Sequence, residues 1–491
     1  MRMPIRKRPK PVDAVSDMAQ QVSFIVDMLG HSSDLVVRHV SEHAALVFVE
    51  PMIDQKALRE SLIQPLSKVP AESLLNLPEL INAIPVATIA EPGNLESVVD
   101  SVAEGKIALV VSGRSVPYLV HLPAHVARQI SPPTTEPSIR GPRDAFTENI
   151  SDNLALVRYR VRNRNLRVRE LVVGKETRTR VAVCHIEGKA SPETVERVVE
   201  RLEAIDSPSI LDSSYLVPYL ANRNWTLLPL AAETERPDRV CSGLLNGRIA
   251  LLCDGSPFAL VMPISLLALF QASEDSFNLA VHSLLLRTVR LLGWLACTMA
   301  PALYIGVSSF NPGMLPPSAV MSIADARRGV PYPPIVEVLI MDIALELLSE
   351  ASVRLPTTVG GAATVVGGLI LGTAAAQARL VSNVMIIVVA FTAIGTFVIP
   401  GYQNQLSWRL LKYFYTFSAA LFGIFGLATA AIIVLVYLCG IDVLGVPYLS
   451  PFAPWRWTAL LKDSIIRLPQ PITDRLGHTQ RQEEDEGTAD A

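Results

Sequence analysis

The 491-residue sequence has few charged residues and no paired cysteines. Asp, Glu, Lys and Arg make up 18% of it, below the roughly 25% usual in soluble domains, while 50% of the residues are hydrophobic. The five cysteines are scattered without a C-x-x-C pair, which argues against a zinc site and a disulfide framework. The formal net charge of −3 argues against a chain whose main role is non-specific binding of nucleic acid. This composition indicates either a very large core or a part that lies in a membrane.

The sequence also lacks the motifs of common catalytic sites. It contains no Walker A sequence, no H-E-x-x-H, no G-x-S-x-G and no G-x-G-x-x-G fingerprint. The eight histidines show no metal-ligand spacing. We therefore expect no enzymatic activity, no cofactor and no metal site.

The two ends of the chain are polar. The first ten residues are basic, but no apolar run of about 7–15 residues follows them, so they are not a secretory signal. We interpret residues 1–21 as a basic, disordered N-terminus. The acidic stretch Gln482-Glu-Glu-Asp-Glu486 favours a solvated C-terminal tail, which we place at 441–491.

The first half contains an internal repeat. The stretch Glu104-Gly-Lys-Ile-Ala-Leu-Val-Val-Ser-Gly113 and the apolar run at 118–123 resemble Asn246-Gly-Arg-Ile-Ala-Leu-Leu-Cys-Asp-Gly255 and the run at 258–263. Each copy predicts a strand, a turn at a glycine and a second strand, because glycine tolerates the positive φ of a tight turn.

The surroundings of the repeat recur as well. Strands predicted at 44–49 and 180–186 are each followed by a predicted helix, at 54–64 and 192–202. Strands that alternate with helices indicate an α/β fold. The sequence therefore predicts an α/β N-terminal region of two similar subdomains. Their limits are predicted as follows: subdomain 1 at 22–125, a Pro-rich linker at 126–150, and subdomain 2 at 151–283.

The second half contains four apolar segments that approach or exceed the length needed to cross a bilayer core about 30 Å thick. Phe414–Leu438 carries no charge at all, which is rare for a helix in a soluble core. Aromatic residues, including Trp294 and Trp408, stand near segment ends, as in an interfacial aromatic belt. We predict an all-α polytopic membrane domain at 284–440, with spans at about 291–310, 357–378, 384–401 and 413–438.

The positive charges that flank the spans do not all favour the same orientation in the membrane. Arg287 and Arg290 precede the first span, which favours cytoplasmic N-terminal domains, but Arg327, Arg328 and Arg354 lie in the next loop. Four crossings return the C-terminus to the cytoplasm, and we expect that layout.

The second span is dominated by small residues at small-xxx-small spacing, which allows close contact between helices. Small side chains also suit a helix that lines a narrow pore in a ring of subunits. From the residues alone, a pore and tight packing are equally supported. The pore-lining candidates are Gly360, Thr364, Gly367, Gly368, Gly372, Thr373 and Gln377.

The segment 333–350 carries an acidic stripe. At 100° per residue, Asp342, Glu346 and Glu350 fall within an arc of about 80° on one face of a helix. Three carboxylates facing lipid are too costly, so the helix either lies at the membrane interface or faces a water-filled cavity. One hypothesis is a vestibule that attracts cations, and the other is a solvated face of an amphipathic helix.

A basic run follows the linker, from Arg158 to Arg169. We do not expect this run to bind nucleic acid. Anionic lipid head groups, an acidic partner surface and a merely solvated face remain open.

Several ordered motifs together resemble the A subunit of GerA-type spore germinant receptors. They cover about residues 131 to 469, and the first ~125 residues diverge. The motifs are Glu136-Pro-Ser-Ile-Arg-Gly-Pro-Arg143, Asn153-Leu-Ala-Leu-Val-Arg158, Ile186-Glu-Gly-Lys189, Thr234-Glu-Arg-Pro-Asp-Arg239, Asp254-Gly-Ser-Pro-Phe258, Gly329-Val-Pro-Tyr-Pro-Pro334, Gly445-Val-Pro-Tyr-Leu-Ser-Pro451 and Asp463-Ser-Ile-Ile-Arg-Leu-Pro469. The related stage V sporulation AF protein shares this pattern, but Gln271-Ala-Ser-Glu-Asp275 and the last motif favour the receptor subunit.

The resemblance implies a multi-pass protein of the endospore inner membrane, with its N-terminal domains on the cytoplasmic side. It implies partners, namely a permease-like B subunit that binds the nutrient and a lipoprotein C subunit. It further implies a homo-oligomeric ring that conducts monovalent cations when germinant binds, and this shifts the second span toward the pore interpretation. The alternatives are a membrane scaffold that organises the receptor without conducting ions, and an ion-release amplifier of the stage V AF type.

Overall fold

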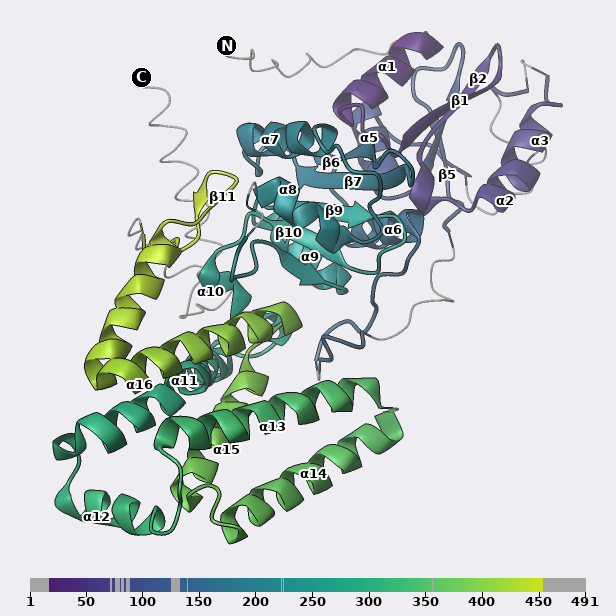
Figure 1. Ribbon diagram of the computed structural model, residues 1–491. Coiled ribbons are helices and arrows are strands. Elements are labelled where there is room, and N and C mark those ends of the chain that lie inside the picture. The colour runs from purple at the N-terminus through teal and green to yellow at the C-terminus, as the bar shows by residue number, and fades with distance from the viewer. Residues whose placement is uncertain are drawn as a thin grey trace, which may run out of the picture. The chain divides into compact units, whose positions relative to one another are not determined.

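The computed structural model in Figure 1 describes most of the chain. The described residues are 17–70, 73–75, 80, 84, 89–124, 133–138, 140–221, 223, 225–355 and 357–453, with the side chains of 353 and 357–365 excluded. They form two compact units, which we describe separately. The two-sheet unit comprises the described residues within 17–138, 142–223 and 231–263, and the helical unit those within 140–141, 225–230 and 264–453.

Two five-stranded antiparallel sheets form the core of the two-sheet unit. The strands of the first are β1 (Leu35–Ser41), β2 (Ala44–Val49), β3 (Ile89–Ala90), β4 (Ile107–Val111) and β5 (Tyr118–Val120), and those of the second are β6 (Leu166–Val173), β7 (Thr179–Ile186), β8 (Ala232–Thr234), β9 (Ile249–Cys253) and β10 (Ala259–Met262). Their orders, β1-β2-β4-β5-β3 and β6-β7-β9-β10-β8, are the same pattern used twice. The strand–turn–strand predicted from each copy of the repeat is confirmed as β4–β5 and β9–β10.

The helices of this unit cover the sheets. They are α1 (Met18–Met28), α2 (Gln55–Ala57), α3 (Gln64–Leu66), α5 (Leu95–Ala103), α6 (Ile150–Arg160), α7 (Pro192–Glu203), α8 (Val217–Ala221) and α9 (Pro237–Leu245), and a π-helical stretch, Leu58–Ile63, joins α2 to α3. On the first sheet, alternate residues face opposite layers: Val47 packs with α1 and α5, and Leu46 packs with the α2–α3 helix. The first sheet is thus buried on both faces.

The N-terminal helix begins earlier than the sequence predicts. Residues 18–21, which we assigned to the disordered N-terminus, form the first turn of α1. The Asp17 carboxylate accepts a hydrogen bond from the Ala19 N–H, and Gln21 and Ile25 are buried. A capped helix start and a buried face stabilise this turn. Residues 1–16 lie outside the described residues.

Within this unit, a buried ion pair joins α6 to the residue just before β1. Arg158 of α6 is 2% exposed, and its Nε and Nη2 donate to the two carboxylate oxygens of Asp34 at 2.8 and 2.9 Å. The Ser32 hydroxyl donates to the same carboxylate at 2.6 Å. The basic run is therefore not simply a solvated face, because Arg158 is buried and paired. Within the same run, Arg167 and Arg169 pair with carboxylates as well.

His185 on β7 makes the stability of the second sheet depend on pH. Its side chain is buried, and Nδ1 has no hydrogen-bond partner among the described residues. Burial, then the positive charges of Arg169 and Arg167, lower the pKa of His185 to about 4. Between pH 6.5 and 4 the unfolded chain binds the proton more readily than the folded one, so stability falls as the pH falls through this window.

Replacing His185 with glutamine is expected to abolish that pH dependence. The wild type should lose up to about 3 kcal/mol between pH 7 and pH 4, because one pKa unit corresponds to about 1.4 kcal/mol. Hydrogen exchange of β7 amides, corrected for intrinsic rates, measures the loss. His282, an exposed histidine, provides the control substitution. Equal acid sensitivity of the wild type and H185Q would contradict the assignment.

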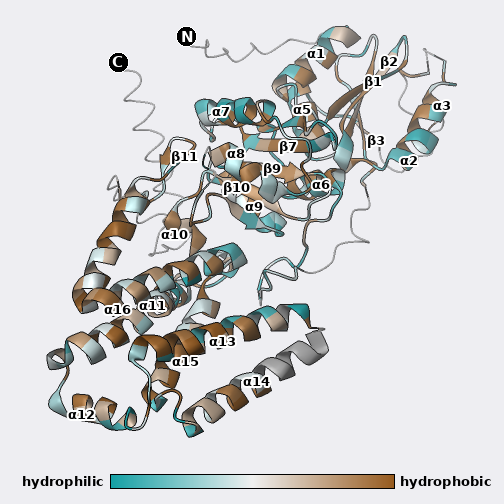
Figure 2. Cartoon of the chain, viewed as in Figure 1, coloured by the Kyte–Doolittle hydropathy of each residue, from teal (hydrophilic) through white to brown (hydrophobic). Residues whose placement is uncertain are grey.

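The helical unit holds helices at all four segments where spans are predicted. Its helices are α10 (Leu266–Leu269), α11 (Ala280–Ile305), α12 (Pro317–Ala326), α13 (Pro334–Arg354), α14 (Thr357–Gln377), α15 (Asn383–Val398) and α16 (Tyr402–Cys439), and a hairpin of β11 (Asp442–Val443) and β12 (Val446–Pro447) follows. In Figure 2 much of α13, α15 and α16 is coloured as hydrophobic, whereas α7 of the other unit is largely hydrophilic. Among the described residues, two helices are long and apolar enough to cross a membrane: Ala280–Phe310, which is α11 with its π-helical extension, and α16.

The last predicted span is not one straight helix. Gly423, inside α16, has φ 64° and ψ −144°, which lies outside the helical region and is essentially restricted to glycine. Two helical pieces therefore meet at Gly423, and the chain bends there (Figure 1). A Cβ atom at this position would lie 2.7 Å from Cβ of Phe310 in the π-helical extension of α11. The sequence predicted a continuous span at 413–438 because apolarity alone does not reveal a backbone break.

Candidate functional site

The acidic face of α13 meets basic residues of α16. Asp342 is 1% exposed, and its carboxylate forms an ion pair with Lys412 Nζ at 3.0 Å. One turn further along, Glu346 pairs with Arg409, whose Nε donates to Glu346 Oε1 at 3.0 Å. The second carboxylate oxygen of Asp342 is buried and has no partner among the described residues. Two of the three predicted acidic residues are thus neutralised within one chain.

The third acidic residue differs from the other two. Glu350 is exposed and pairs with Arg354 on its own helix, four residues further on, at 2.6 Å. Glu346 and Glu350 both line an open depression of about 440 Å³ between α13 and the start of α16. Their carboxylates therefore share one concave surface, while Asp342 lies in the packed contact beside it.

Sequence reasoning missed Glu337, which lies near the start of α13 on the side opposite the acidic face. Glu337 is fully buried, and it accepts hydrogen bonds from Arg327 Nε at 3.2 Å and from the Ser382 N–H at 2.8 Å. It therefore joins the loop before α13 to the start of α15. The cationic partners on α16 were missed as well. The signal was that Arg409 and Lys412, three residues apart, lie on one face of their helix, as Asp342 and Glu346, four residues apart, do on theirs.

Helix α14 has described side chains only from residue 366 onward. Gly360 and Thr364 belong to the helix, but their side-chain environment lies outside the description. A Cβ at Gly367 or Gly368 would meet Leu348 of α13 at 3.0 or 3.7 Å.

Ala375, in the far half of α14, is buried, but other residues of this half are open among the described residues. A Cβ at Gly372 would meet nothing within 4 Å, and Thr373 and Gln377 are exposed. Val366 and Leu369 are also exposed, at 53% and 65%. The small-residue helix is thus packed against α13 on one side, and much of its remaining described surface has no partner in the part of the chain that the structure describes.

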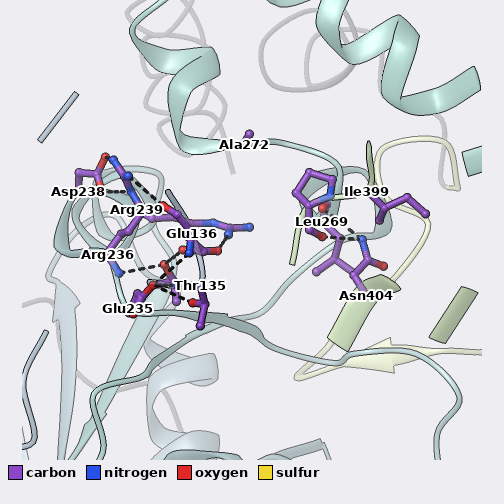
Figure 3. Close-up of polar contacts among 12 residues, drawn as sticks. Thr135, Glu136, Glu235, Arg236, Asp238, Arg239, Leu269, Ala272, Ile399 and Asn404 are labelled. Carbon is purple, nitrogen blue, oxygen red and sulfur yellow. Dashed lines mark hydrogen bonds and ion pairs between the residues drawn. The ribbon is translucent and has the colours of Figure 1, made fainter. Parts of the chain in front are cut away.

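Buried contacts fix the helices beside this site. Arg290 of α11 is buried and binds the carboxylate of Asp275 at 2.8 and 2.7 Å. Trp294 and Trp408 stack edge to face, with ring centroids 5.0 Å apart, and Trp408 is 1% exposed. We expected these rings in an exposed aromatic belt, and for Trp408 that expectation is wrong. The reason is its pairing with Asn404, whose amide also donates to the Leu269 carbonyl (Figure 3).

Two of the recognised motifs interlock in the two-sheet unit (Figure 3). Arg236 is 1% exposed and donates to Ser138 Oγ at 2.6 Å and to the Pro142 carbonyl at 3.2 Å. Glu235 accepts hydrogen bonds from the N–H groups of Thr135 and Glu136 at 2.5 and 3.0 Å. The proline-rich segment therefore forms specific buried contacts with the second subdomain, and this explains why these residue types occur together.

The described part of the chain holds no group of three or more His, Cys, Asp or Glu side chains placed to bind a metal ion. The polar clusters in both units are ion pairs and backbone caps. Their geometry positions helices and loops.

A sequence model of the Bacillus/Clostridium GerA spore germination proteins matches residues 23–476, across both units. The chain belongs to the GerA family. This GerA-family chain is 33% identical over 474 residues to spore germination protein KA of Bacillus subtilis strain 168, which covers 94% of this chain and 87% of that protein. It is 34% identical over 431 residues to the uncharacterized membrane protein YfkQ of the same organism, covering 88% and 80% of the two chains.

Among solved structures, the chain is similar to the crystal structure of the N-terminal domain of the A subunit of the Bacillus megaterium spore germinant receptor GerK3. The match has 29% identity and a TM-score of 0.41, and it covers 52% of this chain and 97% of that one. The family model and the curated relatives confirm the family expected from the motifs.

Proposed function

We propose that the chain is the A subunit of a nutrient germinant receptor and forms a germinant-gated channel for monovalent cations in the spore inner membrane. A permease-like B subunit and a lipoprotein C subunit are its partners, and several copies form a ring. The helical unit is polytopic, and the two-sheet unit lies on the cytoplasmic side. Membership of the GerA family, the two long apolar helices and the membrane relative support this proposal.

The observation that carries the proposal is that small and polar residues of α14 are open to the surroundings, beside exposed apolar side chains such as Leu369. A lipid-facing helix has no need of Gly372, Thr373 and Gln377, which offer little apolar surface. In a ring, the same residues line a narrow passage, and backbone and hydroxyl oxygens can replace part of an ion's hydration shell. The pore-lining set is the one predicted from the sequence: Gly360, Thr364, Gly367, Gly368, Gly372, Thr373 and Gln377.

The α13–α16 ion pairs suit a gate. While Lys412 and Arg409 neutralise Asp342 and Glu346, these carboxylates attract few cations. Separation of α13 from α16 exposes them, together with Glu350, as an acidic vestibule. Moving the channel from 99% closed to 99% open requires about 5.5 kcal/mol of differential binding energy, which the nutrient-bearing partner supplies and a ring can share.

Replacing Gly372 with tryptophan is expected to lower potassium conductance by about half or more, because a large ring enters the passage. A Cβ at Gly372 would have no described atom within 4 Å, so the side chain can begin in open space. Single-channel recording of the protein reconstituted in lipid, and potassium release from germinating spores, measure the effect.

Ala374→Trp is the matched control. Ala374 is also exposed and lies about 200° around the helix from Gly372, so the two substitutions place a ring on opposite sides of α14. Unchanged conductance in G372W, or equal losses in both variants, would remove the pore assignment. A purified receptor that conducts no ions would favour the non-conducting scaffold.

A further inference from the structure

The loop 225–230 belongs to the helical unit, although the chain on both sides of it belongs to the two-sheet unit. Two hydrogen bonds hold it. The N–H of Leu227 donates to the Tyr437 hydroxyl at 3.2 Å, and the hydroxyl of Tyr448, a fully buried side chain, donates to the Pro229 carbonyl at 2.9 Å. The loop is thus fixed to the last turn of α16 and to the hairpin after it.

Side chains of this loop divide into two sets. Leu228 and Leu230 are buried, with 2% and 0% exposed, and they anchor the loop in the helical unit. Trp225 is 95% exposed and Leu227 is 43% exposed. A tryptophan so fully exposed is unusual, because its large apolar ring is normally mostly buried.

The attachment point of the loop is the boundary between apolar and polar surface. Leu435 and Val436, just before Tyr437, are 54% and 65% exposed, as residues that face lipid would be. Asp442, three residues after the end of α16, is exposed and begins the polar hairpin. Tryptophan and tyrosine are enriched at this level of membrane proteins, because one part of the ring system is apolar and another forms hydrogen bonds.

We propose that the loop 225–230 inserts into the lipid head-group region of the bilayer that α16 spans, with Trp225 and Leu227 in contact with lipid. This inference rests on the proposed function, because the bilayer is part of that proposal. The loop then fixes a segment to the membrane surface beside the end of α16, although Leu227 and Tyr437 are 210 residues apart in the sequence. A change in the depth or tilt of α16 reaches the two-sheet unit through it.

Site-specific fluorescence quenching tests the inference. The full chain, with Cys439→Ser to remove the exposed cysteine, is labelled with bimane at a single introduced cysteine and reconstituted in phosphatidylcholine vesicles. The vesicles contain brominated lipids with bromine either near the carbonyl groups or near the acyl-chain ends. The labelled sites are Trp225→Cys, Phe425→Cys, which is 78% exposed on α16, and Val172→Cys, which is 60% exposed on β6. Because all three native side chains are exposed, none of the substitutions removes core packing.

The label at 225 should be quenched at least about twofold more by shallow than by deep bromine, as expected at the interface. The label at 425 should respond to deep bromine, and the label at 172 to neither. Quenching at 425 without quenching at 225 overturns this inference and leaves the membrane assignment standing; it is also the outcome if a protein partner, rather than lipid, covers Trp225. Absence of quenching at 425 overturns the membrane assignment itself.

Discussion

Replacing Lys412 with methionine should lower the free energy of unfolding of the full chain by about 3–5 kcal/mol, because it leaves the buried Asp342 carboxylate without its cation. The two side chains are 7% and 2% exposed, so water cannot take over the lost interaction. Asp342→Asn should be similarly destabilising, since it strands a buried ammonium group. The double variant K412M/D342N should be less destabilised than the sum of the two single variants.

Thermal or denaturant unfolding of the detergent-solubilised protein measures these losses. Arg354→Gln is the matched control, because it removes the exposed ion pair with Glu350 on the same helix, and water and salt screen such a pair so that it contributes little to stability. If K412M costs no more than R354Q, the α13–α16 contact is not desolvated as the structure describes it.

The same residues carry a consequence for ion release. If opening exposes the carboxylates, Asp342→Asn combined with Glu346→Gln should slow potassium release from germinating spores several-fold, through loss of the attraction between the vestibule and cations. Unchanged release from spores that contain normal amounts of the variant would give this helix a purely structural role.

Alanine at Gly423 should be about as disruptive. The backbone conformation at this position costs a residue with a Cβ about 1–3 kcal/mol, and the added atom also collides with Phe310 at 2.7 Å. We expect a loss of stability of several kcal/mol, and reduced accumulation of folded protein, because the colliding atom belongs to the rigid base of a side chain rather than to its flexible end.

Gly440→Ala is the control for this change. Gly440 ends the same helix with φ −84°, and a Cβ there would be in ordinary contact, 3.5 Å from the Tyr437 carbonyl oxygen. Melting temperatures of the two variants in one detergent give the comparison. Equal melting temperatures would mean that the helix is continuous at 423, and the single straight span predicted from the sequence would be restored.

Local patterns were enough to predict much of the secondary structure. The strands at 44–49 and 180–186 are present as β2 and β7, and the helix at 192–202 is present as α7. Strand and helix formation depend mainly on the alternation of apolar residues and on nearby caps and glycines, which a sequence displays directly. The internal repeat also implied that one arrangement of strands would occur twice, as the two identical sheet orders confirm.

The partners of charged and aromatic residues could not be predicted in this way. Arg158 and Asp34 are 124 positions apart, and Lys412 lies 70 positions from Asp342. Glu337, an unremarked acidic residue at the start of α13, is fully buried by contacts with two other segments. Periodicity assigns a residue to a face of its own helix, but the identity of the facing element depends on the whole packing arrangement.

By itself, the sequence determined the family, the antiparallel repeat of strands and the position of the apolar helices, because each is written in contiguous residues. Only the tertiary structure decided that α16 breaks at Gly423, that Trp408 turns inward and that the acidic face of α13 is neutralised by α16. These features arise from contacts between distant segments, whose free energies depend on burial, and burial exists only once the chain has folded.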